Sequence, residues 1–138
     1  MLPTLRHWLH ARQHPLRYAQ LGQLLRNQSL SRDEVLEKQR RDLAAIVAHA
    51  RRQVPYYRER FAGLDGAPFQ ELPLLDKDAL ASHLDDLLAD DADRAQARLG
   101  HTGGSTGKPL AFWYDQAKHE LMRAGMMRGF MMSGWRPG

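Results

Sequence analysis

The stretch His101–Leu110 reads HTGGSTGKPL, and it combines three glycines with four residues that carry a hydroxyl or an amine. Short runs typical of strands flank it, ARLGH before and PLAFWY after. Glycines let a backbone approach an anion closely and adopt positive φ, so that its N–H groups line a concave site. The pattern favours a strand–loop–strand turn that binds an oxyanion, most plausibly phosphate. A flexible linker is the alternative.

Two common phosphate-binding loops do not fit this stretch. A P-loop has four residues between its glycines, then Lys and Ser or Thr, and it leads from a strand into a helix. Here Gly103 and Gly107 enclose three residues, and Lys108 is followed by Pro109. The glycine spacing also fails to match the dinucleotide-binding pattern G-x-G-x-x-G. The sequence therefore predicts a strand, not a helix, after the glycines.

Helices are predicted before the strands. Ser31 and Glu34 have the spacing of a capping box, which starts a helix with apolar residues at helical period. This helix should stop before Pro55, because proline restricts the preceding residue and lacks an amide donor. A second, short helix is expected to begin at Pro55 and to end at Gly63.

Capping signals also bound two later helices. Asp76 is placed to cap a helix from Lys77 to about Leu84, and Asp115 to cap one that runs to about Ser133 and stops at Gly134. The last helix is apolar on most sides, so we expect it to be buried in a larger protein. The predicted fold class is α/β, mostly helical, with one antiparallel strand pair, Arg98–His101 and Leu110–Tyr114.

The glycine-rich stretch resembles the signature loop of adenylate-forming enzymes, T-S-G-S/T-T-G-x-P. Gly103 stands where the usual pattern has Ser, which removes one hydroxyl but keeps the backbone donor. The surrounding segments are similar in order and spacing to the phenylacetate–CoA ligase-like family, closest to its CapK-type branch associated with capsule and exopolysaccharide genes. The similarity covers about residues 30–138. The matching segments are LAAIVAHARRQVPYYRERF, LPLLDKDAL, DDLLADD, GWRPG and, within the loop, Thr102, Gly104, Ser105, Thr106, Gly107 and Pro109.

The resemblance implies an enzyme that uses ATP and Mg²⁺ to join a small carboxylate to AMP and then passes the acyl group to a thiol such as CoA. It implies that residues 31–138 begin the large adenylate-forming domain and that residues 1–30 form a basic, amphipathic helical segment before it. The adenine pocket, the metal-binding acid and the lid lysine of the family would lie beyond Gly138, so we expect no catalytic residue and no metal ligand here. The residues implied to bind the ATP phosphates are Thr102, Gly103, Gly104, Ser105, Thr106, Gly107 and Lys108.

Composition excludes several other classes of protein. The chain has 138 residues and a formal charge of +4, but no aromatic–basic interleaving or nucleic-acid-binding module. It has no cysteine, so disulfides and thiolate metal sites are absent. It lacks a signal peptide pattern, and its richest apolar stretch, Leu121–Trp135, is too short to span a membrane. These features predict a cytoplasmic protein without a nucleic-acid partner; they do not predict its oligomeric state.

Three features carry weaker hypotheses. The N-terminal 32 residues contain five arginines and no acid, which makes contact with an anionic membrane surface an alternative to an ordinary packed helix. His7, His10 and His14 share a helical face, but no acid is near in sequence, and a basic solvated helix explains them better than a metal site. An acidic run is expected to be solvated surface, not a Mg²⁺ site. Its members are Asp85, Asp86, Asp90, Asp91 and Asp93.

A non-enzymatic function is the rival to the ligase hypothesis. On that hypothesis the chain is a truncated relative that serves as an interaction module, and the glycine-rich stretch is only a structural turn. His101, beside this stretch, is a candidate base, although a polar residue at the end of a strand is the simpler interpretation.

Overall fold

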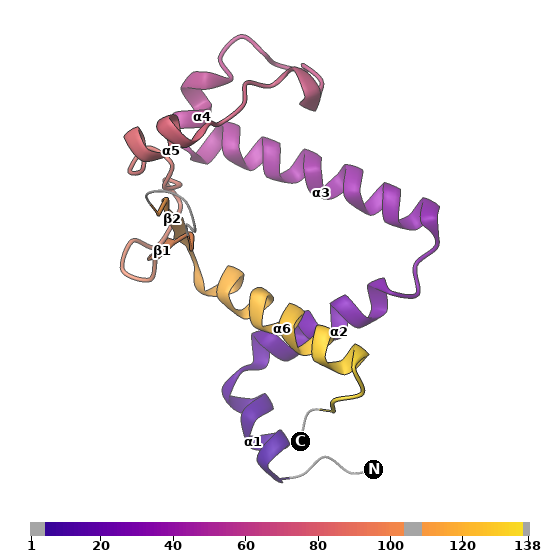
Figure 1. Ribbon diagram of the computed structural model, residues 1–138. Coiled ribbons are helices and arrows are strands. Elements are labelled where there is room, and N and C mark those ends of the chain that lie inside the picture. Colours follow the sequence, from indigo (N-terminus) through magenta and orange to yellow (C-terminus); the bar gives the residue numbers. More distant parts are fainter. Residues whose placement is uncertain (1–4, 104–108, 137–138) are drawn as a thin grey trace. The chain divides into compact units, whose positions relative to one another are not determined.

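The computed structural model describes residues 5–103 and 109–136, with the side chain of Arg6 excepted (Figure 1). The chain divides into two compact units, each described by itself below. The terminal unit comprises residues 1–38 and 116–138, and the central unit comprises residues 39–115. The boundary at residue 38 falls inside one long helix, α3 (Arg32–Gln53).

The terminal unit is built on the contact between α2 (Pro15–Asn27) and α6 (Gln116–Met132). A shorter helix, α1 (Leu5–Gln13), precedes α2, and Pro15 occupies the first turn of α2, where its missing N–H costs nothing. Ala124 of α6 is fully buried, and so is most of Leu21 of α2. A small residue at the contact lets two helices approach closely, so the sequence of α6 determines where α2 packs.

The C-terminal end of α6 is a Schellman motif. Gly134 has φ +91°, and its N–H donates to the carbonyl of Met131, while the N–H of Trp135 donates to the carbonyl of Phe130. The rings of Phe130 and Trp135 also meet edge to face, with centroids 6.2 Å apart. Glycine tolerates the left-handed conformation that this motif needs. The predicted stop at Gly134 is confirmed.

The long helix α3 begins with the predicted capping box. The backbone N–H of Ser31 donates to Glu34 Oε2 over 2.7 Å, and the backbone N–H of Glu34 donates to Ser31 Oγ over 3.3 Å. These two bonds satisfy donors that have no partner within the helix. The helix ends at Gln53, so the predicted end before Pro55 is also confirmed.

Short helices follow α3 in the central unit. Pro55 opens α4 (Pro55–Arg60), which ends three residues before Gly63, a glycine with φ +74°. A single 3₁₀ turn, η1 (Phe69–Glu71), follows Pro68 and was not predicted. The side chain of Asp76 accepts a hydrogen bond of 2.7 Å from the N–H of Ala79, so α5 (Lys77–Ser82) is capped as predicted but ends two residues earlier.

The core of the central unit is small. It consists of four largely buried side chains, Val54, Phe61, Leu72 and Leu88. Backbone bonds join segments around this core: the N–H of Tyr56 donates to the carbonyl of Asp86, and the N–H of Asp90 donates to the carbonyl of Gln53. The unit therefore relies on hydrogen bonds that join α3 and α4 to the chain after α5 as well as on burial.

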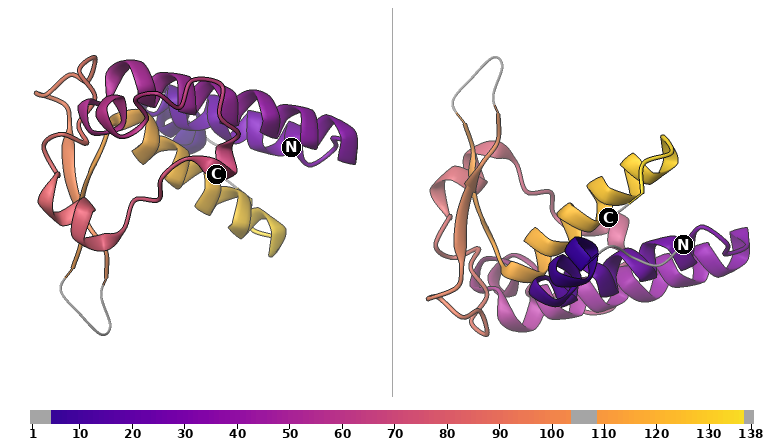
Figure 2. Two further views of the ribbon diagram at one scale, coloured as in Figure 1. Left: turned by 90° about the horizontal axis from the view of Figure 1, so that it is seen from above. Right: turned by 90° about the horizontal axis from the view of Figure 1, so that it is seen from below.

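The two strands pair as predicted. β1 (Arg98–His101) and β2 (Ala111–Tyr114) are antiparallel, with Arg98 opposite Tyr114 and His101 opposite Ala111. They lie side by side in both views of Figure 2. Leu110, predicted as the first residue of the second strand, precedes β2 by one position. The described chain is thus mostly helical with one two-stranded antiparallel sheet, as the sequence predicted.

Among residues 5–103 and 109–136, the structure contains no helix with the length and apolar character needed to cross a membrane.

Candidate functional site

The glycine-rich segment lies in the sequence between two paired strands, β1 and β2. The backbone N–H of Thr102 donates to the carbonyl of Leu110 over 2.9 Å, which continues the ladder one residue beyond β1. In return, the N–H of Leu110 donates to the Thr102 hydroxyl over 3.0 Å. These two bonds hold Thr102 and Leu110 against each other, so the strand pairing continues by one residue on each side of the glycine-rich segment.

The predicted phosphate-binding residues are only partly covered by the structure. Thr102 and Gly103 are exposed at the end of β1, and a side chain at Gly103 would meet no atom within 4 Å. The predicted residues Gly104, Ser105, Thr106, Gly107 and Lys108 lie outside the described residues.

The chain after this segment is extended. Pro109 and Leu110 are not helical, β2 starts at Ala111, and the next helix, α6, begins only at Gln116. A P-loop would need a helix directly after the lysine, because its phosphate sits at a helix N-terminus. The exclusion of a P-loop, made from the sequence, is therefore confirmed by the structure.

Aromatic side chains support the strand pair. The indole Nε1 of Trp113 donates to the carbonyl of Leu84 over 3.1 Å, which ties β2 to the chain after α5. Gly100 lies opposite Phe112, and a Cβ there would come within 2.9 Å of the Phe112 ring and 3.1 Å of Tyr114. Glycine at this position lets the two rings lie over the strand. The strand pair next to the candidate site is thus stabilised by aromatic rings that pack over Gly100.

His101 offers little support for a role as a base. It is exposed at the end of β1, opposite Ala111, and within residues 5–103 and 109–136 it forms no ion pair with a carboxylate. A histidine that acts as a base needs a group that orients its ring. The simpler interpretation, a polar residue at the end of a strand, describes this arrangement.

The acidic run has a structural function that the sequence did not reveal. Asp90 forms an ion pair with Arg58, and Asp86 lies 3.1 Å from the Nδ1 atom of His83. Asp93 accepts hydrogen bonds from the backbone N–H of Ala95 and the side chain of Gln96. Their side chains are partly exposed, as expected; Asp90 joins the chain after α5 to α4, whereas Asp86 and Asp93 make local bonds to residues two or three positions away. In the described part of the chain, no group of three acidic or histidine side chains could hold a metal ion.

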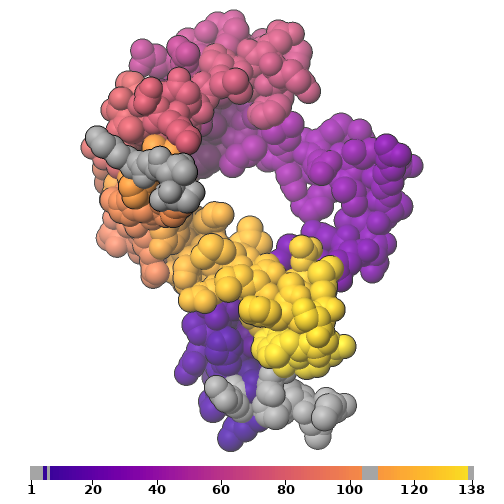
Figure 3. Space-filling model, viewed as in Figure 1, coloured from indigo at the N-terminus to yellow at the C-terminus, as the bar shows by residue number. Residues whose placement is uncertain are grey.

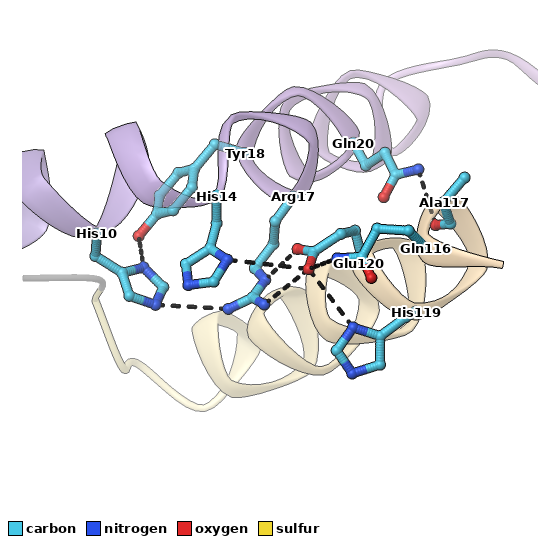
Figure 4. A network of polar contacts seen from close by, with 9 residues as sticks. All are labelled: His10, His14, Arg17, Tyr18, Gln20, Gln116, Ala117, His119 and Glu120. Atoms are coloured by element: carbon cyan, nitrogen blue, oxygen red, sulfur yellow. Dashed lines mark hydrogen bonds and ion pairs between the residues drawn. The ribbon is translucent and has the colours of Figure 1, made fainter. Parts of the chain in front are cut away.

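A second polar cluster surrounds Glu120 in the terminal unit (Figure 4). Arg17 of α2 binds this carboxylate with two parallel bonds, from Nε to Oε2 over 2.7 Å and from Nη2 to Oε1 over 3.2 Å. The side chain of Gln116 donates to Oε1 as well, over 2.9 Å. Only 3% of Glu120 is exposed to solvent. The cluster therefore contains a buried, fully paired carboxylate with two-pronged arginine geometry.

The three histidines around this pair come from both sides of the contact. The Nδ1 atoms of His119 and His14 lie 3.5 and 3.9 Å from Glu120 Oε1, and the ring of His10 lies 3.5 Å from Arg17. His10 also shares a hydrogen bond of 2.9 Å with the Tyr18 hydroxyl. The sequence placed His10 and His14 on one helical face, but the acid next to them is more than 100 residues away along the chain.

Electrostatics at this cluster follow from its composition. The hydrogen bond from Arg17 holds the pKa of Glu120 below its ordinary value, against the opposing effect of burial. Burial raises the pKa of Tyr18, with a smaller opposing effect of Arg17. A carboxylate that is charged and already bound by an arginine is a poor general base. The geometry indicates that Glu120 joins α6 to α2 and does not react.

Comparison of the chain with models of known protein families, with curated proteins and with solved structures finds no match.

Sequence reasoning missed the Arg17–Glu120 pair, a largely buried ion pair of the terminal unit with two bonds. One signal for it is present in the sequence: Glu120 is the only acid in a helix that is otherwise apolar or basic. A lone acid among apolar residues needs a cationic partner if it is buried. The identity of that partner has no signal in the sequence.

Proposed function

We propose that the chain is part of an ATP-dependent, adenylate-forming ligase of the phenylacetate–CoA ligase-like family, in which residues 102–108 bind the phosphates of ATP. The observation that carries this proposal is the strand–turn–strand setting of the glycine- and hydroxyl-rich segment. Its two ends are held together by the paired bonds between Thr102 and Leu110, and a strand, not a helix, follows it.

This setting suits a polyphosphate for physical reasons. A turn that contains three glycines can present several backbone N–H groups to one anion without steric hindrance. The hydroxyls of Ser105 and Thr106 add neutral donors, and Lys108 adds a positive charge. Because Thr102 and Leu110 are already joined, binding of a phosphate group by the residues between them does not also have to bring the two ends of the segment together.

The proposed reaction has two steps. A carboxylate oxygen attacks the α-phosphorus of ATP, the bond to the β-phosphate oxygen breaks, and pyrophosphate leaves with its electron pair. A thiolate then attacks the acyl carbon of the acyl-AMP, and AMP leaves. The turn contributes to the first step, because its donors face negative charge that increases on the departing pyrophosphate.

Other parts of the proposed enzyme are not assigned to these residues. The described residues include no set of three side chains able to hold a metal ion, so the Mg²⁺ that accompanies ATP in this family has no binding site assigned in this chain. The small carboxylate substrate and the acceptor, with CoA as the candidate, are likewise expected to bind elsewhere in the complete enzyme. A function in capsular or exopolysaccharide biosynthesis follows from the CapK-type resemblance alone.

Pyrophosphate exchange tests the proposal. In the complete gene product, the double substitution Ser105→Ala and Thr106→Ala should reduce carboxylate-dependent exchange of pyrophosphate into ATP by about a hundredfold or more, as expected for lost transition-state donors. Lys108→Ala should reduce it less, because a flexible ammonium is a less directed donor than a group fixed on the backbone. Exchange is measured per folded molecule, with folding followed by circular dichroism.

A matched control separates the ligase from an interaction module. Ser29 and Ser133 are exposed and lie outside the turn, so Ser29→Ala with Ser133→Ala removes two hydroxyls without touching the proposed site. We expect full exchange in this control. Exchange that is equal in both double variants would remove the turn from the mechanism. A folded gene product without any carboxylate-dependent exchange would favour the interaction module.

A further inference from the structure

A groove in the terminal unit is lined by large apolar side chains that face solvent. Leu5 and Leu9 of α1 and Met126, Phe130 and Trp135 at the C-terminal end of α6 line it, and each is between 45% and 72% exposed. The groove has a volume of about 1040 Å³. Figure 3 shows the C-terminal end of α6, in yellow, next to the indigo N-terminal helices. A contiguous exposed apolar surface of this kind marks a site of interaction.

The helices around the groove present positive charge without exposed negative charge. The sequences of α1, α2 and α6 contain seven arginines and lysines, and Glu120 is their single acid. Glu120 is buried and neutralised by Arg17, so it contributes no negative surface. The other acids of the terminal unit belong to α3 and do not line the groove; they are Asp33, Glu34 and Glu37.

Three of the arginines line the groove itself. Arg123 and Arg136 line it together with Arg17, and both are exposed. Arg136 donates to the carbonyls of Met131 and Trp135, so its guanidinium stays next to the Trp135 end of the groove. The groove is thus lined both by leucine, methionine and aromatic side chains and by guanidinium groups.

We propose that this groove docks on the surface of an anionic lipid bilayer. The free energy falls when exposed aliphatic side chains leave water for the boundary between lipid headgroups and acyl chains. Tryptophan is favoured at this interface, and arginine is attracted to anionic headgroups. A nucleic acid would complement the charge but would leave the leucines and methionines in water. The acid-free character of the surface fits an anionic bilayer. This inference does not depend on the ligase proposal.

Vesicle binding tests the inference on the complete gene product, in which any further residues that cover α6 are present. We expect it to co-sediment with vesicles of phosphatidylcholine mixed with phosphatidylglycerol, and at least about tenfold more weakly with vesicles of phosphatidylcholine alone. The tryptophan emission should shift to the blue on binding, because Trp135 enters a less polar environment.

Two pairs of substitutions separate the contributions of charge and apolar contact. Arg123→Glu with Arg136→Glu should weaken binding to the anionic vesicles by at least about tenfold. Leu5→Ser with Leu9→Ser should weaken it to a similar degree, since both side chains are exposed and contribute little to folding. The matched control, Arg60→Glu with Arg94→Glu, changes net charge equally at two exposed arginines of the central unit and should bind as the unsubstituted chain does.

Several outcomes would overturn the inference. One is equal binding to both kinds of vesicle, and another is equal weakening by the groove pair and the control pair of charge reversals. A third is a stable dimer in sedimentation velocity that Leu5→Ser with Leu9→Ser converts to monomer while vesicle binding is unchanged, since the groove would then bind a second copy. Circular dichroism confirms that each variant keeps its helical content.

Discussion

The two units of this chain achieve order by different means. The terminal unit joins α2 to α6 through a buried ion pair and a fully buried alanine, Ala124. The central unit joins short elements through capping side chains and backbone bonds, such as the bond that the N–H of Ala79 donates to the side chain of Asp76. A contact between long helices concentrates stability in a few side chains, whereas a unit of short elements distributes it over many weak local bonds.

Charge separates the units as clearly as packing does. The terminal unit contains ten arginines and lysines and four acids, whereas the central unit contains ten and twelve. The formal charge of +4 therefore arises wholly in the terminal unit. This distribution places the attraction for an anionic surface on one unit, and the same unit carries the exposed groove.

The largest effect on stability is expected at the buried pair. Glu120→Ala should lower the free energy of unfolding of the terminal unit by about 3 kcal/mol, because it leaves Arg17 with an unpaired charge in a largely buried position. Tryptophan fluorescence can follow the two units separately in urea: Trp135 lies in the terminal unit and Trp113 in the central unit. In variants that retain one tryptophan, the Trp135 transition should shift and the Trp113 transition should not.

Two further variants sharpen this test. Arg17→Met with Glu120→Leu should recover more than half of the loss, since an apolar pair of similar size carries no desolvation cost. Glu71→Ala removes an exposed carboxylate of the central unit and should change stability by less than about 0.5 kcal/mol. Equal shifts of both tryptophan transitions would mean that the two units unfold together, and the contrast between them would then fail.

A smaller effect is expected for a cap in the central unit. Asp76→Ala removes the acceptor for the N–H of Ala79 and should cost about 1 kcal/mol, seen in the Trp113 transition. Asp78→Ala, two residues later in the first turn of α5, removes an exposed acid that is not the cap. It should lower the free energy of unfolding by only about a few tenths of a kcal/mol. A larger loss for Asp78→Ala than for Asp76→Ala would show that helix-dipole electrostatics, not the cap, stabilises α5.

The smallest effect is expected from mild acid, and it should be confined to the terminal unit. The pKa of Glu120 is lowered in the folded chain from its ordinary value of 4.5, chiefly by the hydrogen bond from Arg17. The contribution of this pair is therefore fully present above about pH 4.5 and is lost as the pH falls through the lower, folded-state value. The urea midpoint of the Trp135 transition should fall as the pH is lowered over this range. Glu120→Gln should make this midpoint less dependent on pH. An equal dependence in Glu120→Gln would assign it to other carboxylates.

Local sequence signals were sufficient for most of the secondary structure. The capping box at Ser31, the proline at 55, the cap at Asp76 and the glycine at 134 each act through atoms within a few residues, so their effects can be predicted without a tertiary structure. The pairing of Arg98–His101 with the strand after the glycines could be predicted because a short turn leaves two strands little choice but to pair antiparallel. The 3₁₀ turn at Phe69–Glu71 had no such signal.

The sequence by itself determined where α3, α4 and α5 begin, where α3 and α6 end, and that two paired strands flank the glycine-rich segment, since these features depend on neighbours along the chain. Only the tertiary structure decided that Arg17 binds Glu120, that Trp113 donates to Leu84, and that His14 of the N-terminal segment lies near an acid of the last helix. Such partners are chosen by packing: a buried carboxylate requires some cation, but helix geometry determines which of many arginines can reach it.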